Sequence, residues 1–413
     1  MIRAVKGTRD ILPPSSGVWN DVERKARDVF RAYNFREIRT PIFEETLLFA
    51  RGVGEETDIV SKEMYTFEDR DGASLTLRPE CTASVIRAYI EHRFDQLPGL
   101  MRLYYMGPMF RRERPQKGRY RQFYQIGAEA IGSESPAVDA EIIEMALEVL
   151  TGAGLSGFQL LLNSVGCSEC RPKFVAALRD ELRKVGSSMC PDCRRRAETN
   201  PLRVLDCKVE ADQPIIDRLP SILDHLCDDC RKHFETVRGY LNDREIGYEV
   251  RPRLVRGLDY YTRTTFEITH GALGAQNSVL GGGRYDGLAE ALGSKVHSPG
   301  IGFSIGEDRL VLTIEEAKAG SNNGELDLLV APLGEAAFRK TAALVRRIRQ
   351  SGKSVEVVPD VRLKRALELA NKLGARFALI VGDNEIAAGS FQLKNMATGE
   401  QQTVTESEIF ERL

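Results

Sequence analysis

One short segment concentrates the positive charge of the chain. Residues 111–121 hold six cationic side chains and one carboxylate, whereas the whole chain has a net charge of −2. The cations are Arg111, Arg112, Arg114, Lys117, Arg119 and Arg121. A charge run usually covers a solvated face, but guanidinium groups also pair bidentately with phosphate oxygens. The flanking runs 103–110 and 123–127 predict two strands joined by this basic loop, a hairpin suited to phosphate binding.

Four further clusters combine charged or aromatic side chains with turn or strand patterns. They are Arg78 with Glu80, Arg-Gly-Leu-Asp-Tyr-Tyr at 256–261, a glycine run leading to an arginine at 281–286, and the glycine-rich segment 300–310. Each has an ordinary structural explanation: a surface ion pair, core packing of tyrosines, or glycines in turns. Taken singly, none of the four assigns a site.

Seven of the eight cysteines lie between positions 167 and 230, and six of them form Cys-x-x-Cys pairs. The pairs are Cys167 with Cys170, Cys190 with Cys193, and Cys227 with Cys230, and Cys207 is left over. In a reducing compartment this spacing favours zinc over disulfides. Residues 171–186 are predicted to form one helix, about 24 Å long at 1.5 Å per residue, which would hold the first two pairs apart. The predicted zinc ligands are therefore Cys190, Cys193, Cys227 and Cys230, and reduced thiols without a metal are the alternative.

Length and composition are those of a globular protein with several domains. The chain has 413 residues, of which 42% are hydrophobic and 29% charged, and its length predicts two to four domains. No apolar stretch approaches the roughly 20 residues that cross a bilayer. Residues 1–9 lack the apolar core of a signal peptide. We therefore expect a cytoplasmic protein without membrane contact.

Hydrophobic periodicity places the clusters on an α+β scaffold. Before residue 270, the predicted helices are 17–33 and 138–150. The predicted strands are 35–46, 73–77, 103–110, 123–127, 158–163, 248–254 and 264–268. Residues 164–248 shift to helix formers and cysteines, which predicts a mostly helical insertion. Residues 319–324 are predicted to be a linker.

Beyond the linker, strand-length runs alternate with helical stretches, a pattern typical of an α/β unit. The predicted strands are 326–331, 355–358, 377–381, 391–395 and 403–404, and the helices are 335–350 and 362–373. The expected domains are a catalytic region of residues 1–163, an inserted cysteine-rich module of 164–248, the remainder of the catalytic region at 249–318, and a C-terminal domain of 325–413.

In this order, the clusters resemble the motifs of the class II aminoacyl-tRNA synthetases, and in particular those of the histidyl-tRNA synthetase family. Residues 40–41 resemble the first, dimer-forming class II motif, residues 110–111 with the basic loop the second, and residues 302–309 the third. Residues 256–261 and 282–286 resemble the two signatures peculiar to the histidine enzymes. The resemblance covers nearly the full length of the chain.

The resemblance implies an antiparallel sheet with flanking helices, a C-terminal α/β anticodon-binding domain and a homodimer. It implies a ligase that activates L-histidine with ATP to histidyl-adenylate, with Mg²⁺ on the ATP phosphates, and then transfers the histidyl group to the 3′ end of tRNA(His). The alternative is the histidine-binding regulatory paralogue of ATP phosphoribosyltransferase. A regulatory subunit has no need of a tRNA-gripping loop, so the intact loop at 111–121 favours the ligase.

The resemblance also assigns roles to residues. The catalytic residues are Arg111, Arg256 and Arg309, which with Glu113 bind ATP. The histidine-binding residues are Arg78, Glu80, Thr82, Gln125, Glu129, Tyr260 and Tyr261, of which Glu129 and Tyr261 pair with the two imidazole nitrogens. The tRNA-binding residues are Arg112, Arg114, Lys117, Arg119 and Arg121. The cysteine pairs are not part of the general family pattern.

Overall fold

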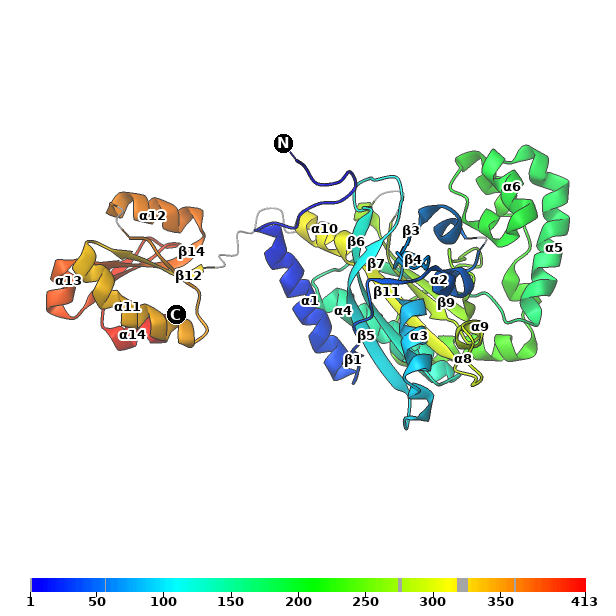
Figure 1. Ribbon diagram of the computed structural model, residues 1–413, viewed down its shortest axis with the longest axis horizontal. Coiled ribbons are helices and arrows are strands. Elements are labelled where there is room, and N and C mark those ends of the chain that lie inside the picture. Colours follow the sequence, from blue (N-terminus) through cyan, green and yellow to red (C-terminus); the bar gives the residue numbers. More distant parts are fainter. Residues whose placement is uncertain (1, 56, 274–276, 318–325, 360–361) are drawn as a thin grey trace. The chain divides into compact units, whose positions relative to one another are not determined.

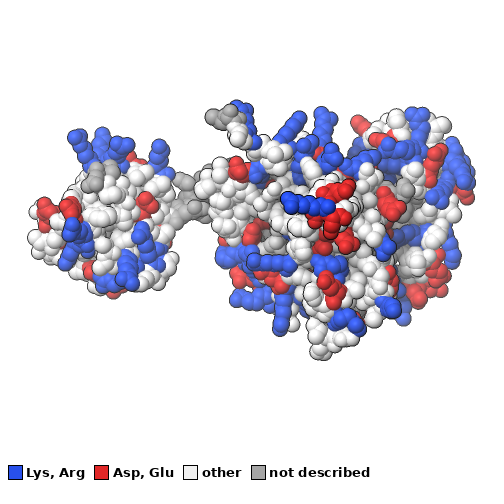
Figure 2. Space-filling model, viewed as in Figure 1, with Lys and Arg blue, Asp and Glu red and all other residues white. Residues whose placement is uncertain are grey.

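The computed structural model describes residues 2–55, 57–273, 277–317, 326–359 and 362–413 (Figure 1). The chain divides into two compact units, Met1–Ala317 and Lys318–Leu413. The predicted linker 319–324 lies outside the described residues. Among the described helices, none has both the length and the apolarity needed to cross a membrane. Basic and acidic side chains are interspersed over the visible face of each unit, in keeping with the small net charge (Figure 2).

A sheet of eight described strands forms the centre of the first unit, in the order β1-β5-β6-β11-β10-β9-β7-β8. The strands are β1 (Arg36–Glu37), β5 (Met101–Phe110), β6 (Gln122–Ile131), β11 (Gly300–Gly306), β10 (Ser278–Arg284), β9 (Thr262–His270), β7 (Phe158–Ser164) and β8 (Glu249–Val250). The six inner strands all pair antiparallel, and the two-residue edge strands β1 and β8 pair parallel. The antiparallel sheet expected from the sequence is therefore confirmed.

Two predicted strands are much shorter than expected. Within 35–46 only β1 and β2 (Phe43–Glu45) are paired as strands. Within 248–254 only β8 is paired as a strand. Pro41 and Pro252 interrupt these segments, because proline has no N–H to donate to a neighbouring strand. The short β2 joins β4 (Ser74–Leu77) and β3 (Tyr65–Glu68) in a separate small sheet.

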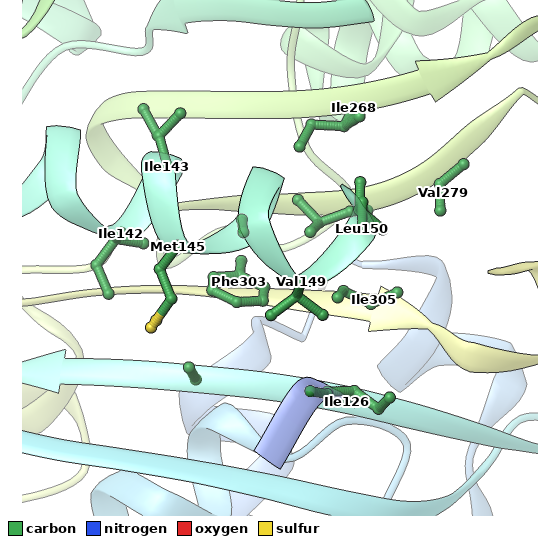
Figure 3. Packing of buried hydrophobic residues seen from close by; sticks show 14 of the residues in the cluster. Ile126, Ile142, Ile143, Met145, Val149, Leu150, Ile268, Val279, Phe303 and Ile305 are labelled. Carbon is green, nitrogen blue, oxygen red and sulfur yellow. The ribbon is translucent and has the colours of Figure 1, made fainter. Parts of the chain in front are cut away.

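Two helices, α1 (Ser15–Ala32) and α4 (Pro136–Gly152), cover one face of the large sheet. In α1 the buried residues recur every three or four positions, as an amphipathic helix requires: Trp19, Val22, Ala26 and Phe30. Helix α4 begins with Ser135, which caps the first turn, and Pro136, whose missing N–H costs nothing there. Figure 3 shows residues of α4 packed on residues of the sheet: Ile142, Ile143, Val149 and Leu150 lie against Ile126, Ile268, Phe303 and Ile305.

The alternation of side chains along each strand leaves the opposite face for polar groups. On β11, Ile301, Phe303 and Ile305 belong to the core. Between them, Gly302 and Ser304 face a cavity on the other side of the sheet. On that side lie α3 (Thr82–Glu91), α2 (Thr46–Val53) and the small sheet.

The inserted segment is mostly helical, as predicted, and packs around a small core of its own. Its helices are α5 (Cys170–Val185), α6 (Pro191–Thr199), α7 (Gln213–Ile216) and α8 (Asp228–Asp243), with short 3-10 turns between them. Phe174, Leu178 and Leu182 line one face of α5 and enter this core. Figure 1 shows α5 and α6 gathered to one side of the large sheet, whereas α8 returns to pack on α4.

The second unit has its own five-stranded sheet in the order β13-β12-β14-β15-β16. Its elements are β12 (Leu326–Pro332), α11 (Glu335–Gln350), β13 (Val355–Val357), α12 (Leu363–Lys372), β14 (Ala375–Val381), α13 (Asp383–Ala388), β15 (Phe391–Asn395), β16 (Gln401–Val404) and α14 (Glu406–Arg412). Leu328 and Val330 pack in one cluster with α11, and Leu329 and Ala331 pack in another with α12. Helices therefore cover both faces, and the predicted α/β pattern is confirmed.

Candidate active site

A cavity of about 790 Å³ opens on the face of the large sheet away from α4, a size typical of small-molecule sites. Strands β6, β9, β10 and β11 form its floor, and segment 256–261, the basic loop and part of the insertion form its walls. Eleven of the residues predicted to bind histidine, ATP or tRNA line it: Glu80, Thr82, Arg111, Glu113, Arg119, Gln125, Glu129, Arg256, Tyr260, Tyr261 and Arg309. Elements distant in sequence therefore bring most of the predicted site together.

Glu129 is a buried carboxyl group held by hydroxyl donors. Thr82 Oγ1 and the Tyr285 hydroxyl each donate to it at 2.7 Å, and the Tyr105 hydroxyl lies 3.4 Å away. Burial raises the pKa of Glu129 to about 8, although the hydroxyl donors oppose this rise. Since an imidazole has an ordinary pKa of about 6.5, this carboxyl group can share one proton with a bound imidazole ring.

Tyr261 contributes a hydroxyl donor to the same cavity. Its ring centroid lies 4.8 Å from that of Tyr260, and both side chains line the cavity. Burial raises the pKa of Tyr261 to about 12. Its hydroxyl group therefore keeps its proton near neutral pH and can donate or accept a hydrogen bond.

Glu80 is fixed at the start of α3. Its carboxylate accepts the backbone N–H groups of Thr82 at 2.8 Å and Ala83 at 2.9 Å. The Tyr260 hydroxyl donates to the same side chain at 3.4 Å. Burial raises the pKa of Glu80, and the backbone donors at the helix N-terminus oppose this. The result is an oriented carboxyl group beside the cavity, suited to an ammonium group.

Three arginines from separate elements line the cavity. Arg111 follows β5, Arg256 precedes β9, and Arg309 lies in the first turn of α10 (Glu307–Ala317). Arg111 and Arg309 donate to backbone carbonyl groups at 2.8 and 2.7 Å, and Arg256 forms an ion pair with Glu267. Guanidinium groups stay charged in proteins, so these three are held ready for an anion with little reorganisation.

Two glycines make room for charged side chains across the sheet. A Cβ atom on Gly281 would lie 1.8 Å from an Arg256 nitrogen, and one on Gly302 would lie 1.7 Å from Glu129 Oε2. Any larger residue at either position would displace the charged group. The glycine-rich segments therefore serve close packing of site residues on β10 and β11.

Two arginines of the sequence clusters do not reach the cavity. Arg78 donates to the carbonyl groups of Thr40 and Pro108 at 3.0 Å, and it does not line the cavity. Its assignment to histidine binding is corrected: the buried guanidinium ties residue 40 to strand β5. Arg284 is fully buried as well and pairs with Asp139 at 2.7 Å, which holds β10 to α4.

The basic loop divides into exposed and inward-facing cations. Three of the five predicted tRNA-binding residues are exposed: Arg112, Arg114 and Lys117. Arg119 instead lines the cavity and pairs with Glu113 at 2.9 Å. Arg121 packs against Gly7, where a Cβ atom would approach its side chain to 2.8 Å. Lys117 pairs with Glu316, so Arg112 and Arg114 are the exposed cations of the loop best placed to meet a large polyanion.

The cysteines of the insertion form two groups. The Sγ atoms of Cys167, Cys170, Cys227 and Cys230 lie within 4.8 Å of one another, as do the ligand atoms of Cys190, Cys193, Cys207 and Asp212. The predicted ligand set Cys190, Cys193, Cys227 and Cys230 is therefore wrong. Helix α5 does separate the first two pairs as expected. However, the start of α8 lies beside the start of α5, so Cys227 and Cys230 lie next to Cys167 and Cys170.

Among the cavity residues missed in the sequence are Tyr105, Glu267 and Tyr285. Tyr285 lies within the glycine-run cluster, so its neighbours pointed to it. Glu267 stands between Phe266 and Ile268 on β9, and a carboxylate that alternates with core residues was a usable signal. Tyr105 could not be identified from the sequence. It lies in the apolar run 103–110, in which residues on both faces of the strand are apolar, so the pattern does not show which side chains face the cavity.

The antiparallel sheet, with three fixed arginines over its open face, agrees with the catalytic domain of a class II aminoacyl-tRNA synthetase. The family model described as histidyl-tRNA synthetase matches residues 7–310, and the model described as anticodon binding domain matches residues 327–413. The chain belongs to the histidyl-tRNA synthetase family.

Individual relatives agree with this assignment. The histidine–tRNA ligase of Solibacter usitatus is 73% identical over 413 residues, covering 100% of this chain and 99% of the relative. The histidine–tRNA ligase of Koribacter versatilis is 58% identical, covering 99% of this chain and 95% of the relative. The crystal structure of apo S. aureus histidyl-tRNA synthetase matches with a TM-score of 0.81 at 38% identity, covering 100% of this chain and 99% of that one.

The regulatory alternative shares the fold. A Bacillus halodurans structure described as ATP phosphoribosyltransferase regulatory subunit/histidyl-tRNA synthetase matches with a TM-score of 0.63 at 20% identity, covering 92% of this chain and 98% of that one. This similarity concerns the fold alone. The relatives at 73% and 58% identity are ligases by name, so the regulatory reading is not favoured.

Proposed function

We propose that this chain ligates histidine to tRNA(His) in two steps within the cavity described above. An oxygen of the histidine carboxylate attacks the α-phosphorus of ATP, and the bond to pyrophosphate breaks, giving histidyl-adenylate. The 3′-terminal ribose hydroxyl of tRNA then attacks the carbonyl carbon and loses its proton as AMP departs. The observation that carries the proposal is one cavity that joins a buried carboxyl–tyrosine pair to three fixed arginines.

The arginines act in the first step. Arg111 and Arg256 hold the α-phosphate, where negative charge accumulates, and Arg309 holds the γ-phosphate. Preorganised cations stabilise that charge without a reorganisation cost at the moment of reaction. Class II synthetases generally use ATP with Mg²⁺, which would neutralise the β- and γ-phosphates. Glu113 lines the cavity and offers an oxygen ligand of the kind that Mg²⁺ prefers.

Histidine recognition uses the two carboxyl groups at the other part of the cavity. Glu80 and Thr82, with Gln125, bind the α-amino and carboxylate groups of the amino acid. Glu129 and Tyr261 pair with the two ring nitrogens. An amino acid without an imidazole would leave these buried groups unpaired, which costs far more than a missing methylene.

A homodimer is supported by apolar side chains on the small sheet and α2. The side chains of Ile42, Phe43, Leu47 and Phe67 are 45 to 53% exposed. The first three follow shortly after residues 40–41 of the first motif. Contiguous exposed apolar groups of this kind are typical of an interface. Because the proposed reaction belongs to protein synthesis, we place it in the cytoplasm. The zinc ion expected in the insertion stays a prediction.

The function is tested by aminoacylation. The purified chain, given tRNA(His) transcript, ATP, Mg²⁺ and labelled histidine, should form labelled tRNA that is sensitive to mild base, as an ester is. Omission of ATP should abolish the product. Absence of labelled tRNA under conditions in which a known histidine–tRNA ligase charges the same transcript would exclude the proposed function.

The raised pKa of Glu129 predicts a pH window for histidine activation. Between pH about 6.5 and about 8, free histidine has a neutral ring and Glu129 is protonated. The complex then contains one proton shared between Glu129 and the nearer ring nitrogen of histidine. Below this window the ring carries an extra proton, and above it Glu129 has lost its own. kcat/KM for histidine should therefore fall about tenfold per pH unit on each side.

The window is measured by pyrophosphate exchange at subsaturating histidine from pH 5.5 to 9. Glu129→Gln cannot titrate, so its profile should lose the decline between pH 8 and 9 and keep the acidic one. An unchanged upper decline in Glu129→Gln would show that another group causes it.

The exposed cations of the basic loop predict a salt-dependent defect in tRNA charging. Arg112→Ala/Arg114→Ala should leave adenylate formation nearly unchanged, because neither side chain lines the cavity. It should weaken tRNA binding and lower the slope of log affinity against log salt by about one per lost phosphate contact. Arg24→Ala/Arg31→Ala, which removes two exposed arginines of α1, is the charge-matched control. An equal salt slope in both double variants would contradict the role of the loop.

A further inference from the structure

The two cysteine groups of the insertion lie at opposite ends of α5, and we propose that each binds one structural zinc ion. The base site consists of Cys167, Cys170, Cys227 and Cys230, and the tip site consists of Cys190, Cys193, Cys207 and Asp212. Base and tip refer to the ends of α5 nearer to and farther from β7. The two sites use seven of the eight cysteines of the chain.

The sulfur spacing of the base site fits a shared metal ion. Cys167 Sγ lies 3.7 Å from Cys170 Sγ and 3.8 Å from Cys227 Sγ. Four thiolates at about 2.3 Å from a central zinc ion stand about 3.8 Å from one another. A disulfide would bring a pair to about 2.05 Å, and all four cysteines are free. The arrangement is that of a tetrahedral site.

The tip site combines three thiols with a buried carboxylate. Cys190 Sγ lies 3.9 Å from Cys207 Sγ, and Cys207 Sγ lies 3.3 Å from Asp212 Oδ2. Asp212 is only 2% exposed, and the backbone N–H of Cys190 donates to it at 3.1 Å. A carboxylate withdrawn from water needs hydrogen-bond donors or a cation, and thiolate sulfur and carboxylate oxygen are both zinc ligands.

Backbone amide groups point at the sulfur atoms in both sites. In the base site, Cys167 N–H donates to Cys170 Sγ at 3.2 Å and Glu169 N–H donates to Cys167 Sγ at 3.4 Å. In the tip site, Cys193 N–H donates to Cys190 Sγ and Val209 N–H donates to Cys207 Sγ, both at 3.4 Å. Such donors orient metal ligands and favour the thiolate form.

The base site would fasten the insertion to the strand that follows the histidine signature. Cys170 begins the first long helix of the insertion, α5, and Cys227 directly precedes the last, α8. Next to Cys167, Val165 and Gly166 exchange backbone hydrogen bonds with Arg263 at 2.8 Å. The Arg171 guanidinium, on α5, donates to the carbonyl group of Tyr261. A metal ion here would hold the start of the insertion beside a residue proposed to read the imidazole.

The tip site would shape part of the cavity wall. The chain between Cys193 and Cys207 carries Arg196 and Arg203, which line the cavity. Each forms an ion pair at 3.7 Å with Asp58, which also lines the cavity. A metal ion at the tip site would tie the two ends of this segment together and so fix the positions of Arg196 and Arg203 beside the cavity.

Elemental analysis of the full chain, purified without chelator, tests both sites without reference to catalysis. We expect two equivalents of zinc per chain. Cys167→Ser/Cys227→Ser should lose one equivalent, and Cys190→Ser/Cys207→Ser should lose the other. Cys81→Ala, which removes the eighth cysteine from a separate core cluster, should keep both.

Each result decides between the sites. Less than a tenth of an equivalent in the wild type would overturn the proposal. If the wild type binds only one equivalent of zinc, the double variant that still binds it identifies the site that does not hold zinc, and the proposal for that site is overturned. If a double variant fails to fold, stepwise titration of the folded wild type with an organomercurial replaces it: two zinc ions should be released as seven thiols are consumed. Thiols that react without releasing zinc would contradict metal binding.

Discussion

Arg256→His should slow histidyl-adenylate formation by a factor of about 10² to 10³ and leave histidine binding largely intact. Arg256 is held over the cavity by Glu267 and fits only because position 281 is glycine. Its proposed contact gains most strength as charge moves onto the α-phosphate, so its loss should appear in turnover. Loss of one oriented donor in such a site costs roughly 3–4 kcal/mol. Single-turnover adenylate formation measures the rate, and equilibrium dialysis measures histidine binding.

Two controls separate the phosphate contact from the ion pair. Arg251→His alters an arginine that pairs with Glu249 outside the cavity and should change neither quantity. Glu267→Gln removes the partner of Arg256 but keeps the guanidinium, so adenylate formation should fall much less than in Arg256→His. If histidine binding collapsed in Arg256→His while turnover of bound substrate survived, the assigned role would be wrong.

Glu129→Gln should lower kcat/KM for histidine by about 10- to 150-fold while the KM for ATP stays nearly constant. The substitution preserves shape but removes the group that shares a proton with the imidazole ring. A hydrogen bond to a charged group contributes about 1.5–3 kcal/mol, which sets the expected range. Pyrophosphate exchange at varied histidine and varied ATP measures both constants.

The matched control for Glu129→Gln lies at the end of the same strand. Glu134 follows β6 and pairs on the surface with Arg263 and His297. Glu134→Gln should leave kcat/KM for histidine within about twofold of the wild type, because exposed ion pairs contribute little. A comparable loss in both variants would point to a general disturbance of β6, against a specific role for Glu129.

The site could be predicted from the sequence where residue type and local motif coincide. Arg111 begins the basic loop, Arg256 begins a short signature with Gly257, and Arg309 follows the glycine-rich segment. All three line one cavity. The inner strands were predictable because their buried residues alternate or run together. The predicted strands 35–46 and 248–254 proved shorter because Pro41 and Pro252 interrupt them. Both prolines are visible in the sequence, so the shorter strands could also have been predicted.

Other features depended on contacts that no local pattern reveals. Arg78 has the same charge as Arg111, and only the positions of the Thr40 and Pro108 carbonyl groups show that two of its guanidinium nitrogens are bonded to the backbone. The cysteine pairing failed for a similar reason. Helix α5 was predicted correctly, but the return of α8 to the start of α5 is a tertiary arrangement. Asp212 became a candidate ligand only when the fold buried it beside Cys207.

Pyrophosphate exchange with each of the twenty amino acids in turn tests histidine specificity most directly. The full chain, ATP, Mg²⁺ and labelled pyrophosphate are sufficient, so tRNA does not enter the result. Exchange should occur with histidine alone, because only an imidazole pairs with Glu129 and Tyr261 at once. Exchange with another amino acid at a rate equal to that with histidine, or no exchange with any of the twenty, would contradict the proposed function.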